Sequence, residues 1–312
     1  MIGVGVVYDL VGTLFAAVSV ACVLDRGEPR RWSRAVFWGL FAASFLFGDR
    51  LGDRGNGVLV LALVLIGGLG GLGRATPAAA LAPPARARGA VLFLPILLAP
   101  AITLAGSLAF KAITPGGRPL VDPRQVTVIS LALGVVLALA VAMILLRATP
   151  AAPVREARRL LNAVGWSAVL PQLMAALGAV LSLAGVGRAV GDLATHGLPL
   201  GHRWVAVGAY GLGMALFTMI MGNAFAALPV MIGAIGAPLL IGRFGGDPAV
   251  VGALGMLCGY CGTLMTPMAA HNIVPTALLD LPSGAVIRAQ APTALFVLAA
   301  NLVLIDLFAF RA

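Results

Sequence analysis

The sequence predicts an all-α, polytopic integral membrane protein with about 8–10 transmembrane segments, including a re-entrant hairpin and a broken helix in the C-terminal half. The first observation is composition: 61% of the 312 residues are hydrophobic, 10% are charged and the mean hydropathy is +1.04. Soluble domains do not have this composition. The second observation is a series of long apolar runs, and the third is a group of helix-breaking residues inside the last of them.

Ten apolar runs approach the roughly 20 helical residues that cross about 30 Å of hydrocarbon. Short polar connections separate these runs, so the sequence leaves no room for a soluble catalytic domain. The runs lie at Val4–Leu24, Trp32–Gly48, Gly57–Gly73, Gly89–Phe110, Val126–Leu146, Trp166–Val186, Val205–Met221, Ala224–Ile241, Pro248–Met268 and Ala291–Phe310.

A polar, proline-containing connection divides the chain into two bundles. Residues 1–150 predict an N-terminal scaffold bundle of conventional spans, and residues 151–163 predict an amphipathic connecting segment. Residues 164–312 predict a C-terminal bundle that contains a hairpin, 205–241, and a broken helix, 248–272. Its segments are interrupted by Gly, Pro, Thr and Asn at membrane depth.

The net charge of +10 would suggest nucleic acid in a soluble protein, but here arginines cluster in loops beside apolar spans. We therefore expect lipid headgroups, and not nucleic acid, as their partners. The bias places the odd-numbered connections in the cytoplasm and the N-terminus in the periplasm of a bacterial inner membrane. The first, third and fifth connections hold Arg26, Arg30, Arg31, Arg34, Arg74, Arg86, Arg88, Arg147, Arg155, Arg158 and Arg159, against Arg50, Arg54, Lys111, Arg118 and Arg124 in the second and fourth.

Only Gly222-Asn223 separates the seventh and eighth runs. This is too short for an aqueous loop between two full spans unless the turn is very tight, and a re-entrant hairpin with its tip at these residues fits more easily. Two full spans that turn at the membrane surface are the alternative. The ninth run then meets Gly259, Gly262 and Pro267, so it cannot remain a continuous helix to its end.

Uncovered backbone groups cost several kcal/mol each in hydrocarbon, so these interruptions must be buried in protein or line a wet cavity. Broken helices offer N–H groups to an anion and carbonyl groups to a cation. We therefore predict a substrate path in which asparagine amides and threonine hydroxyls supply hydrogen bonds. The candidate substrate-binding residues are Gly222, Asn223, Gly262, Thr263, Thr266, Pro267 and Asn272.

Other residues with chemical potential have simpler interpretations. His271 is a candidate for proton coupling, or else a histidine at the membrane surface. The pair Cys258-x-x-Cys261 has redox or metal spacing but lacks a βαβ context and a second ligand pair. Asp9 and Asp306 lie within about two turns of a span end, where an interfacial position is easier than a buried one. We expect no catalytic residue, metal site or cofactor, apart from Na⁺ as a coupling ion.

Several stretches resemble one bacterial permease family, the domain of unknown function numbered nine-seven-nine, which is described as a 5-oxoproline (pyroglutamate) transporter subunit. The most specific are Met221-Gly-Asn-Ala-Phe-Ala-Ala-Leu-Pro-Val230, Gly255-Met-Leu-Cys-Gly-Tyr-Cys-Gly-Thr-Leu-Met-Thr-Pro-Met-Ala-Ala270 and Asn272-Ile-Val-Pro-Thr-Ala-Leu-Leu279. The resemblance covers most of the chain. It implies that residues 164–312 form a transport bundle.

A more distant similarity links Asn223 to Pro229, and Thr266-Pro267 followed by Asn272, to the hairpin tip and unwound helix of the ion transporter superfamily of carboxylate carriers. It implies that Asn223 and Asn272 line one substrate and cation site. Those carriers have two inverted repeats, whereas one such unit is visible here. The second half would come from a shorter permease subunit or from a homodimer.

Together these observations predict a secondary transporter subunit that moves a small carboxylate, 5-oxoproline by resemblance, with Na⁺ or H⁺. A non-transporting membrane scaffold or assembly subunit is the first alternative. An intramembrane enzyme is the second, but only the two cysteines and His271 offer reactive groups, with no carboxylate in the cluster. We therefore expect a protein that is not an enzyme.

Overall fold

The computed structural model describes residues 2–73, 89–113, 119–197, 199–279, 281–282 and 284–310. These residues form helices joined by short connections, with no β-strand and one isolated parallel bridge, between Ile2 and Val121. Within these described ranges, eight helical stretches are long and apolar enough to cross a membrane. The all-α, polytopic membrane class is therefore confirmed, and the chain divides after Gly165 into two compact units.

The first unit is built from two helical hairpins and a short amphipathic helix. In the α1–α2 hairpin, Phe15 stacks on Trp38, Phe41 and Phe45 with ring centroids 5.3–5.7 Å apart. In the α3–α4 hairpin, a Cβ on Gly134 would lie 2.6 Å from the Ala99 carbonyl oxygen, so glycine allows this close approach. The elements are α1 (Gly5–Leu24), α2 (Arg31–Gly68), the 3₁₀ turn η1 (Gly89–Leu92), α3 (Phe93–Ala112), α4 (Val126–Leu146) and α5 (Ala152–Val164).

Element α2 contains two runs that we expected to be separate spans, as two helical segments that meet at a kink. The kink is at Gly52, whose backbone is non-helical, with a φ of 61° in the left-handed region that glycine adopts easily. Asn56 donates from Nδ2 to the Gly48 carbonyl oxygen at 2.8 Å and covers one of the carbonyls near the kink. Arg50 and Arg54 lie on either side of it. The expected loop arginines Arg74, Arg86, Arg88 and Arg118 lie outside the described residues.

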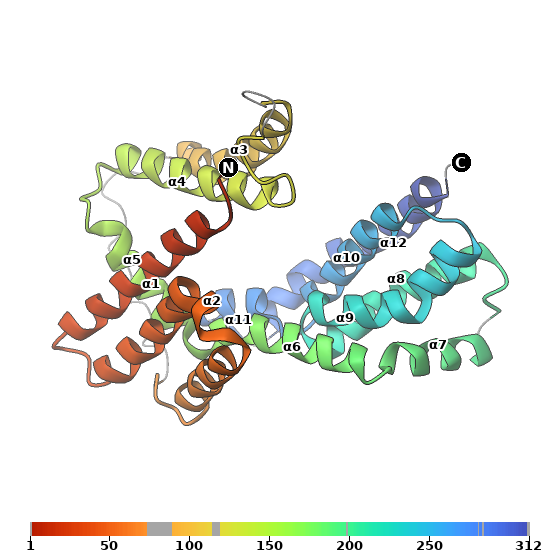
Figure 1. The fold of residues 1–312 in the computed structure, drawn as a ribbon, viewed down its shortest axis with the longest axis horizontal. Helices are drawn as coiled ribbons and strands as arrows, with labels where there is room; N and C mark the ends of the chain where they lie inside the picture. Colours follow the sequence, from red (N-terminus) through yellow and green to blue (C-terminus); the bar gives the residue numbers. More distant parts are fainter. Residues whose placement is uncertain are drawn as a thin grey trace. The chain divides into compact units, whose positions relative to one another are not determined.

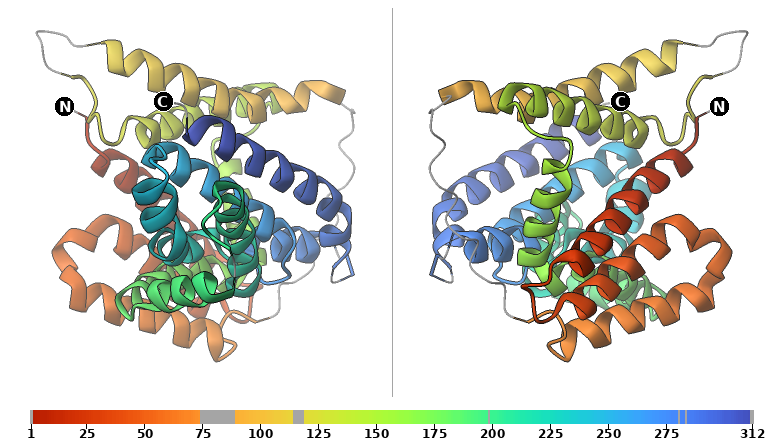
Figure 2. Two further views of the ribbon diagram at one scale, coloured as in Figure 1. Left: turned by 90° about the vertical axis from the view of Figure 1, so that its right-hand side faces the viewer. Right: turned by 90° about the vertical axis from the view of Figure 1, so that its left-hand side faces the viewer.

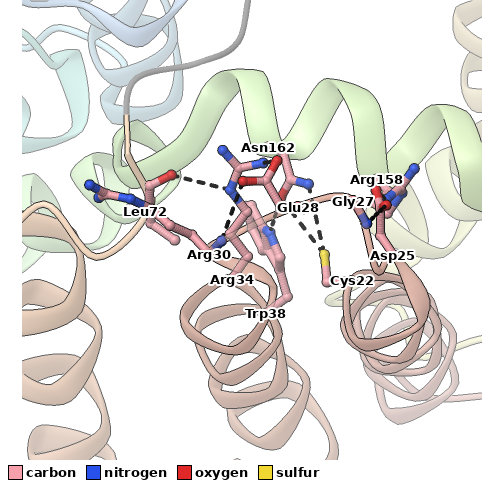
Figure 3. A network of polar contacts seen from close by, with 10 residues as sticks. All are labelled: Cys22, Asp25, Gly27, Glu28, Arg30, Arg34, Trp38, Leu72, Arg158 and Asn162. Carbon is pink, nitrogen blue, oxygen red and sulfur yellow. Dashed lines mark hydrogen bonds and ion pairs between the residues drawn. The ribbon is translucent and has the colours of Figure 1, made fainter.

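Helix α5, formed by the amphipathic segment 151–163, packs against the C-terminal end of α1 (Figure 2). Figure 3 shows the polar network at this junction. Arg158 forms an ion pair with Asp25, and Trp38 donates from Nε1 to Asn162 Oδ1 at 2.9 Å. Arg34, also in this network, is 6% exposed and reaches Glu28 at 2.8 Å. These contacts hold α5 at the ends of two apolar helices.

The second unit is arranged around α10, which contacts α8, α9 and α12 (Figure 1). Its core contains Tyr210, Met214, Cys258 and Ile305, all fully buried. The elements are the 3₁₀ turn η3 (Gly165–Val169), α6 (Leu170–Leu183), α7 (Val186–Gly197), α8 (Arg203–Met221), α9 (Ala224–Met231), the π-helical η4 (Ile232–Arg243), α10 (Pro248–Leu264), α11 (Ala270–Leu278) and α12 (Ala285–Ala309).

Helix α7 was not expected from the sequence, because its polar residues suggested a connection. It packs against the end of α9 and against η4 through small residues spaced one turn apart. A Cβ on Gly187 would lie 2.9 Å from the Val230 carbonyl oxygen, and one on Gly191 would lie 2.8 Å from that of Ala234. Tertiary packing therefore selects the helix, and its polar residues lie on the remaining faces.

Asp306 is buried, at 4% side-chain exposure, although it lies on the apolar helix α12. Arg203, at the start of α8, donates from Nε to Asp306 Oδ1 at 2.7 Å and from Nη2 to Oδ2 at 3.0 Å. Its guanidinium also lies over the Phe310 ring. Asp306 is therefore buried with a charged partner, in place of the interfacial position that we expected, and the pair ties the ends of α8 and α12 together. Asp9 is exposed.

The Asp25–Arg158 pair predicts a small dependence of stability on pH. The hydrogen bond and charge of Arg158 hold the pKa of Asp25 below its usual value. The stabilisation is therefore present above the unfolded-state pKa of about 3.9 and is lost as the pH falls through the folded value. We expect the wild type to be more stable than Asp25→Asn by under about 1 kcal/mol at neutral pH, since both side chains are partly exposed.

The test is to measure the thermal unfolding midpoints of the two proteins in detergent between neutral and acid pH. The difference between them should close below about pH 4. A difference that stays constant down to about pH 2 would show that Asp25 stabilises α5 by something other than its charge.

The Arg203–Asp306 pair predicts a larger effect. Arg203→Ala would leave a buried carboxylate without its bidentate partner, and we expect a loss of about 2–4 kcal/mol in the free energy of unfolding. Arg288→Ala, which removes an exposed arginine with no carboxylate partner among the described residues, is the matched control and should be nearly neutral. Equal thermal midpoints for the two variants would contradict a structural role for the pair.

Candidate functional site

The tip between α8 and α9 is formed by two predicted site residues. Gly222 ends α8 in the left-handed conformation, with φ 75°, and donates its N–H to the Thr218 carbonyl oxygen at 2.7 Å. Asn223 begins α9, where its Oδ1 accepts a hydrogen bond from the Phe225 N–H at 2.8 Å. The Asn223 amide nitrogen has no partner among the described residues, so it remains free to donate. The two arms have 19 and 20 residues, each long enough to cross a membrane.

The predicted break in the ninth run is present. Helix α10 ends at Leu264 and α11 begins at Ala270, with Thr266 and Pro267 between them. Thr266 is 1% exposed. Its hydroxyl donates to the Met219 carbonyl oxygen at 2.8 Å, near the end of α8, and accepts from the Met268 N–H at 3.3 Å.

The Asn272 side chain, 3% exposed, covers the end of α10. Its amide nitrogen lies 2.9, 3.3 and 2.8 Å from the carbonyl oxygens of Thr263, Leu264 and Thr266. The nitrogen carries two hydrogens, so three carbonyl oxygens share two donors. Asn272 Oδ1 is buried and has no hydrogen-bond partner in the described part of the chain. An unpaired buried acceptor of this kind is unusual and is costly in apolar surroundings.

The tip and the break are in direct contact. A Cβ on Gly222 would lie 2.9 Å from Met268 Cβ and 3.2 Å from the Met268 carbonyl oxygen. Together with the Thr266–Met219 hydrogen bond, this contact places the end of α8, the start of α9 and the break at one position. The negative end of the α10 dipole and the positive ends of α9 and α11 therefore lie near one another.

A cavity of about 260 Å³ lies beside the break, between α11 and the first turn of α12. Its walls are mostly apolar, with Asn272 and Thr276 as the polar side chains. The lining residues are Pro267, Asn272, Ile273, Thr276, Gly284, Val286 and Ile287.

The remaining predicted residues differ in what they contact. Gly262 is packed in the α8–α10 contact, where a Cβ would lie 2.3 Å from the Ala215 carbonyl oxygen. The Thr263 hydroxyl donates to the Tyr260 carbonyl oxygen of its own helix at 2.7 Å. His271 is exposed at the start of α11.

Both thiols of the C-x-x-C pair are buried in the core of the second unit. Asn301 Nδ2 contacts Cys261 Sγ at 3.8 Å, and so joins α12 to α10. Among the described residues, there is no group of three or more His, Cys, Asp or Glu side chains that is placed to hold a metal ion.

Sequence reasoning missed two polar residues near the break. The Thr276 hydroxyl donates to the Asn272 carbonyl oxygen at 2.6 Å, and Thr276 lines the cavity. Its position four residues after Asn272 would have indicated that they share a helix face. Thr218 is fully buried with an unpaired hydroxyl, and no sequence signal separates it from a threonine that bonds its own helix.

The chain belongs to the family described as "Protein of unknown function (DUF979)", whose family model matches residues 5–310. The family expected from the sequence is therefore confirmed over nearly the whole chain. No curated protein and no solved structure gives a significant match.

The contact between the tip and the break predicts a strong sensitivity at Gly222. Gly222→Ala would place a side chain in a left-handed conformation against Met268, and we expect a loss of about 2 kcal/mol in the free energy of unfolding. Gly208→Ala is the control, because Gly208 lies on the same helix α8 with no atom within 4 Å of an added Cβ. Thermal unfolding should show the control unchanged or stabilised. A Gly222→Ala protein as stable as the wild type would mean that the tip is not in close contact with Met268 at the break.

Proposed function

We propose that this chain is the membrane subunit of a secondary active transporter that moves a small carboxylate across the bacterial inner membrane with Na⁺. The observation that carries the proposal is the convergence of three carbonyl oxygens on Asn272 at a helix break, against a hairpin tip. Interrupted helices at membrane depth are typical of substrate and ion sites in such carriers. The sequence has no nucleotide-binding motif that would couple transport to ATP.

The geometry of the break supports Na⁺ as the coupling ion. The carbonyl oxygens of Thr263, Leu264 and Thr266 lie within 3.3 Å of one point, which the Asn272 amide nitrogen occupies. A half-turn of the amide would bring its unpaired oxygen to that point. Four oxygens so close together repel one another unless a cation lies among them, and the C-terminal end of α10 adds negative potential.

Proton coupling through His271 has less support. This side chain is exposed and makes no hydrogen bond among the described residues. Its protonation is therefore not coupled through a hydrogen bond to the carbonyl oxygens at the break. The buried polar groups at the break are amides, hydroxyls and carbonyls, which do not titrate near neutral pH. A buried cluster of oxygen-bearing groups that do not ionise favours cation coordination over proton transfer.

The N-termini of α9 and α11 suit the substrate carboxylate, since each offers backbone N–H groups and the positive end of a dipole. Asn223 Nδ2, which has no partner within the described residues, can donate as well. The sequence has no Arg or Lys from 205 to 242, so dipoles and amides would hold the anion weakly and reversibly. We propose 5-oxoproline, which presents one carboxylate and one lactam N–H, because the sequence resembles a permease family described as a 5-oxoproline transporter subunit.

The assembly is inferred from the number of interrupted helices, and the orientation from the arginine distribution. One hairpin and one broken helix are present in the described residues, whereas similar carriers use two. We propose that a second, shorter permease subunit supplies the other half, with a homodimer as the alternative. The arginine bias supports a periplasmic N-terminus.

Uptake of radiolabelled 5-oxoproline tests the proposal in cells that lack their own carriers, with and without the second, shorter permease subunit. Uptake should require Na⁺ and fall when choline replaces it. We expect Asn272→Ala to reduce uptake about 10-fold or more and to raise the Na⁺ concentration needed, because it removes a buried ligand. Asn223→Ala should mainly raise the KM for the carboxylate.

Asn301→Ala is the matched control for that assay, since Asn301 is also 3% exposed but its amide contacts Cys261 Sγ and not the carbonyl oxygens at the break. Uptake should remain once it is corrected for the amount of protein. Wild-type uptake that Asn223→Ala and Asn272→Ala leave unchanged would remove the site assignment. If no uptake occurs either with or without the second subunit, 5-oxoproline is not the substrate.

Chemical labelling separates the carrier from a membrane scaffold. The native cysteines are all buried, so a cysteine at Asn223 can be followed by itself with a water-soluble maleimide. At a hairpin tip inside the membrane it should react slowly and be protected by substrate. Gly201→Cys, in an exposed turn with no atom within 4 Å, is the fast control. Equal, unprotected labelling at both positions would favour a surface turn and the scaffold alternative.

A further inference from the structure

We propose that the arginine-rich junction of α1, α2 and α5 binds the headgroups of anionic phospholipids such as phosphatidylglycerol. The site lies wholly in the first unit, and it is independent of the transport function proposed for the second. Its framework is the network in Figure 3, which holds α5 against the ends of two apolar helices.

The charges at this junction are unequal. Segments 25–34 and 152–164 contain seven arginines and three carboxylates. Each carboxylate already has an arginine partner, in the pairs Asp25–Arg158, Glu28–Arg34 and Glu156–Arg159. The four arginines left over have no carboxylate partner among the described residues, and they are Arg26, Arg30, Arg31 and Arg155.

The partners that these arginines do have are neutral. Arg30 donates to the Gly70 carbonyl oxygen, and Arg155 donates to Thr149 Oγ1 at 3.2 Å. The Arg31 guanidinium lies 5.4 Å from the centre of the Trp32 ring. Arg26 and Arg155 are exposed. An anion that approaches the junction therefore meets four positive charges and displaces no ion pair.

Exposed apolar side chains beside these charges indicate that the anion is a lipid. Leu24 is 74% exposed, Trp32 60% and Leu160 40%, and they lie on α1, α2 and α5. A soluble phosphate has no apolar part that could pack against these side chains. A phospholipid places its phosphate on the arginines and its acyl chains on the apolar side chains, as basic clusters at membrane boundaries do.

Thermal unfolding of the purified full chain in neutral detergent tests the site, with phosphatidylglycerol or phosphatidylcholine added in increasing amounts. Phosphatidylglycerol should raise the midpoint of the wild type, and phosphatidylcholine should not. In the triple variant Arg26→Gln, Arg31→Gln and Arg155→Gln, the phosphatidylglycerol concentration for half the shift should rise on the order of 100-fold. None of these residues belongs to the carboxylate pairs, so α5 should stay docked.

Two controls make the outcome decisive. The triple variant Arg188→Gln, Arg243→Gln and Arg288→Gln removes the same charge from the second unit, and it should respond as the wild type does. The corresponding lysine triple variant at positions 26, 31 and 155 should keep most of the response if charge is what matters. An equal response in all variants would overturn the site, and so would an equal shift from inorganic phosphate, which would indicate a soluble anion as the ligand.

Discussion

The covering of backbone carbonyl groups at the break between α10 and α11 is the constraint on which the second unit depends. A helix that ends inside an apolar bundle exposes carbonyl oxygens that water cannot reach, at several kcal/mol each. The Asn272 amide covers those of Thr263, Leu264 and Thr266, which fixes α11 relative to α10. The Thr266 hydroxyl then covers the Met219 carbonyl oxygen at the end of α8. Break and tip are therefore parts of one structure.

In the proposed carrier, this arrangement explains why a cation and an anion would bind together. The carbonyl oxygens at the end of α10 repel a carboxylate, while the N-termini of α9 and α11 attract it. A Na⁺ ion at Asn272 would cancel the repulsion, so that the carboxylate binds well only after the ion. Coupling then arises from local electrostatics, without an arginine to hold the substrate, and the substrate can leave once the ion has left.

The first unit uses its polar residues differently. Its network pairs every carboxylate of the α1–α2 connection and α5 with an arginine and leaves the surplus positive charge at the ends of the spans. Aromatic stacking of Phe15 on Trp38 and Phe41 holds the underlying hairpin. A basic boundary of this kind suits contact with anionic lipid headgroups, in contrast to the interrupted helices of the second unit.

The sequence by itself determined the helical membrane class, the family, the limits of Val126–Leu146 and the presence of a break in the run that begins at Pro248, because hydrophobic length and the backbone effects of glycine and proline are local properties. Only the tertiary structure decided the partners. Arg203 and Asp306 are 103 residues apart in the chain, and Trp38 and Asn162 are 124 apart. Helix α7 and the packing role of Gly262 depend equally on distant neighbours. The contacts of Asn272, which carry the proposed function, arise because the chain must cover carbonyl groups whose positions are set only once the bundle has folded.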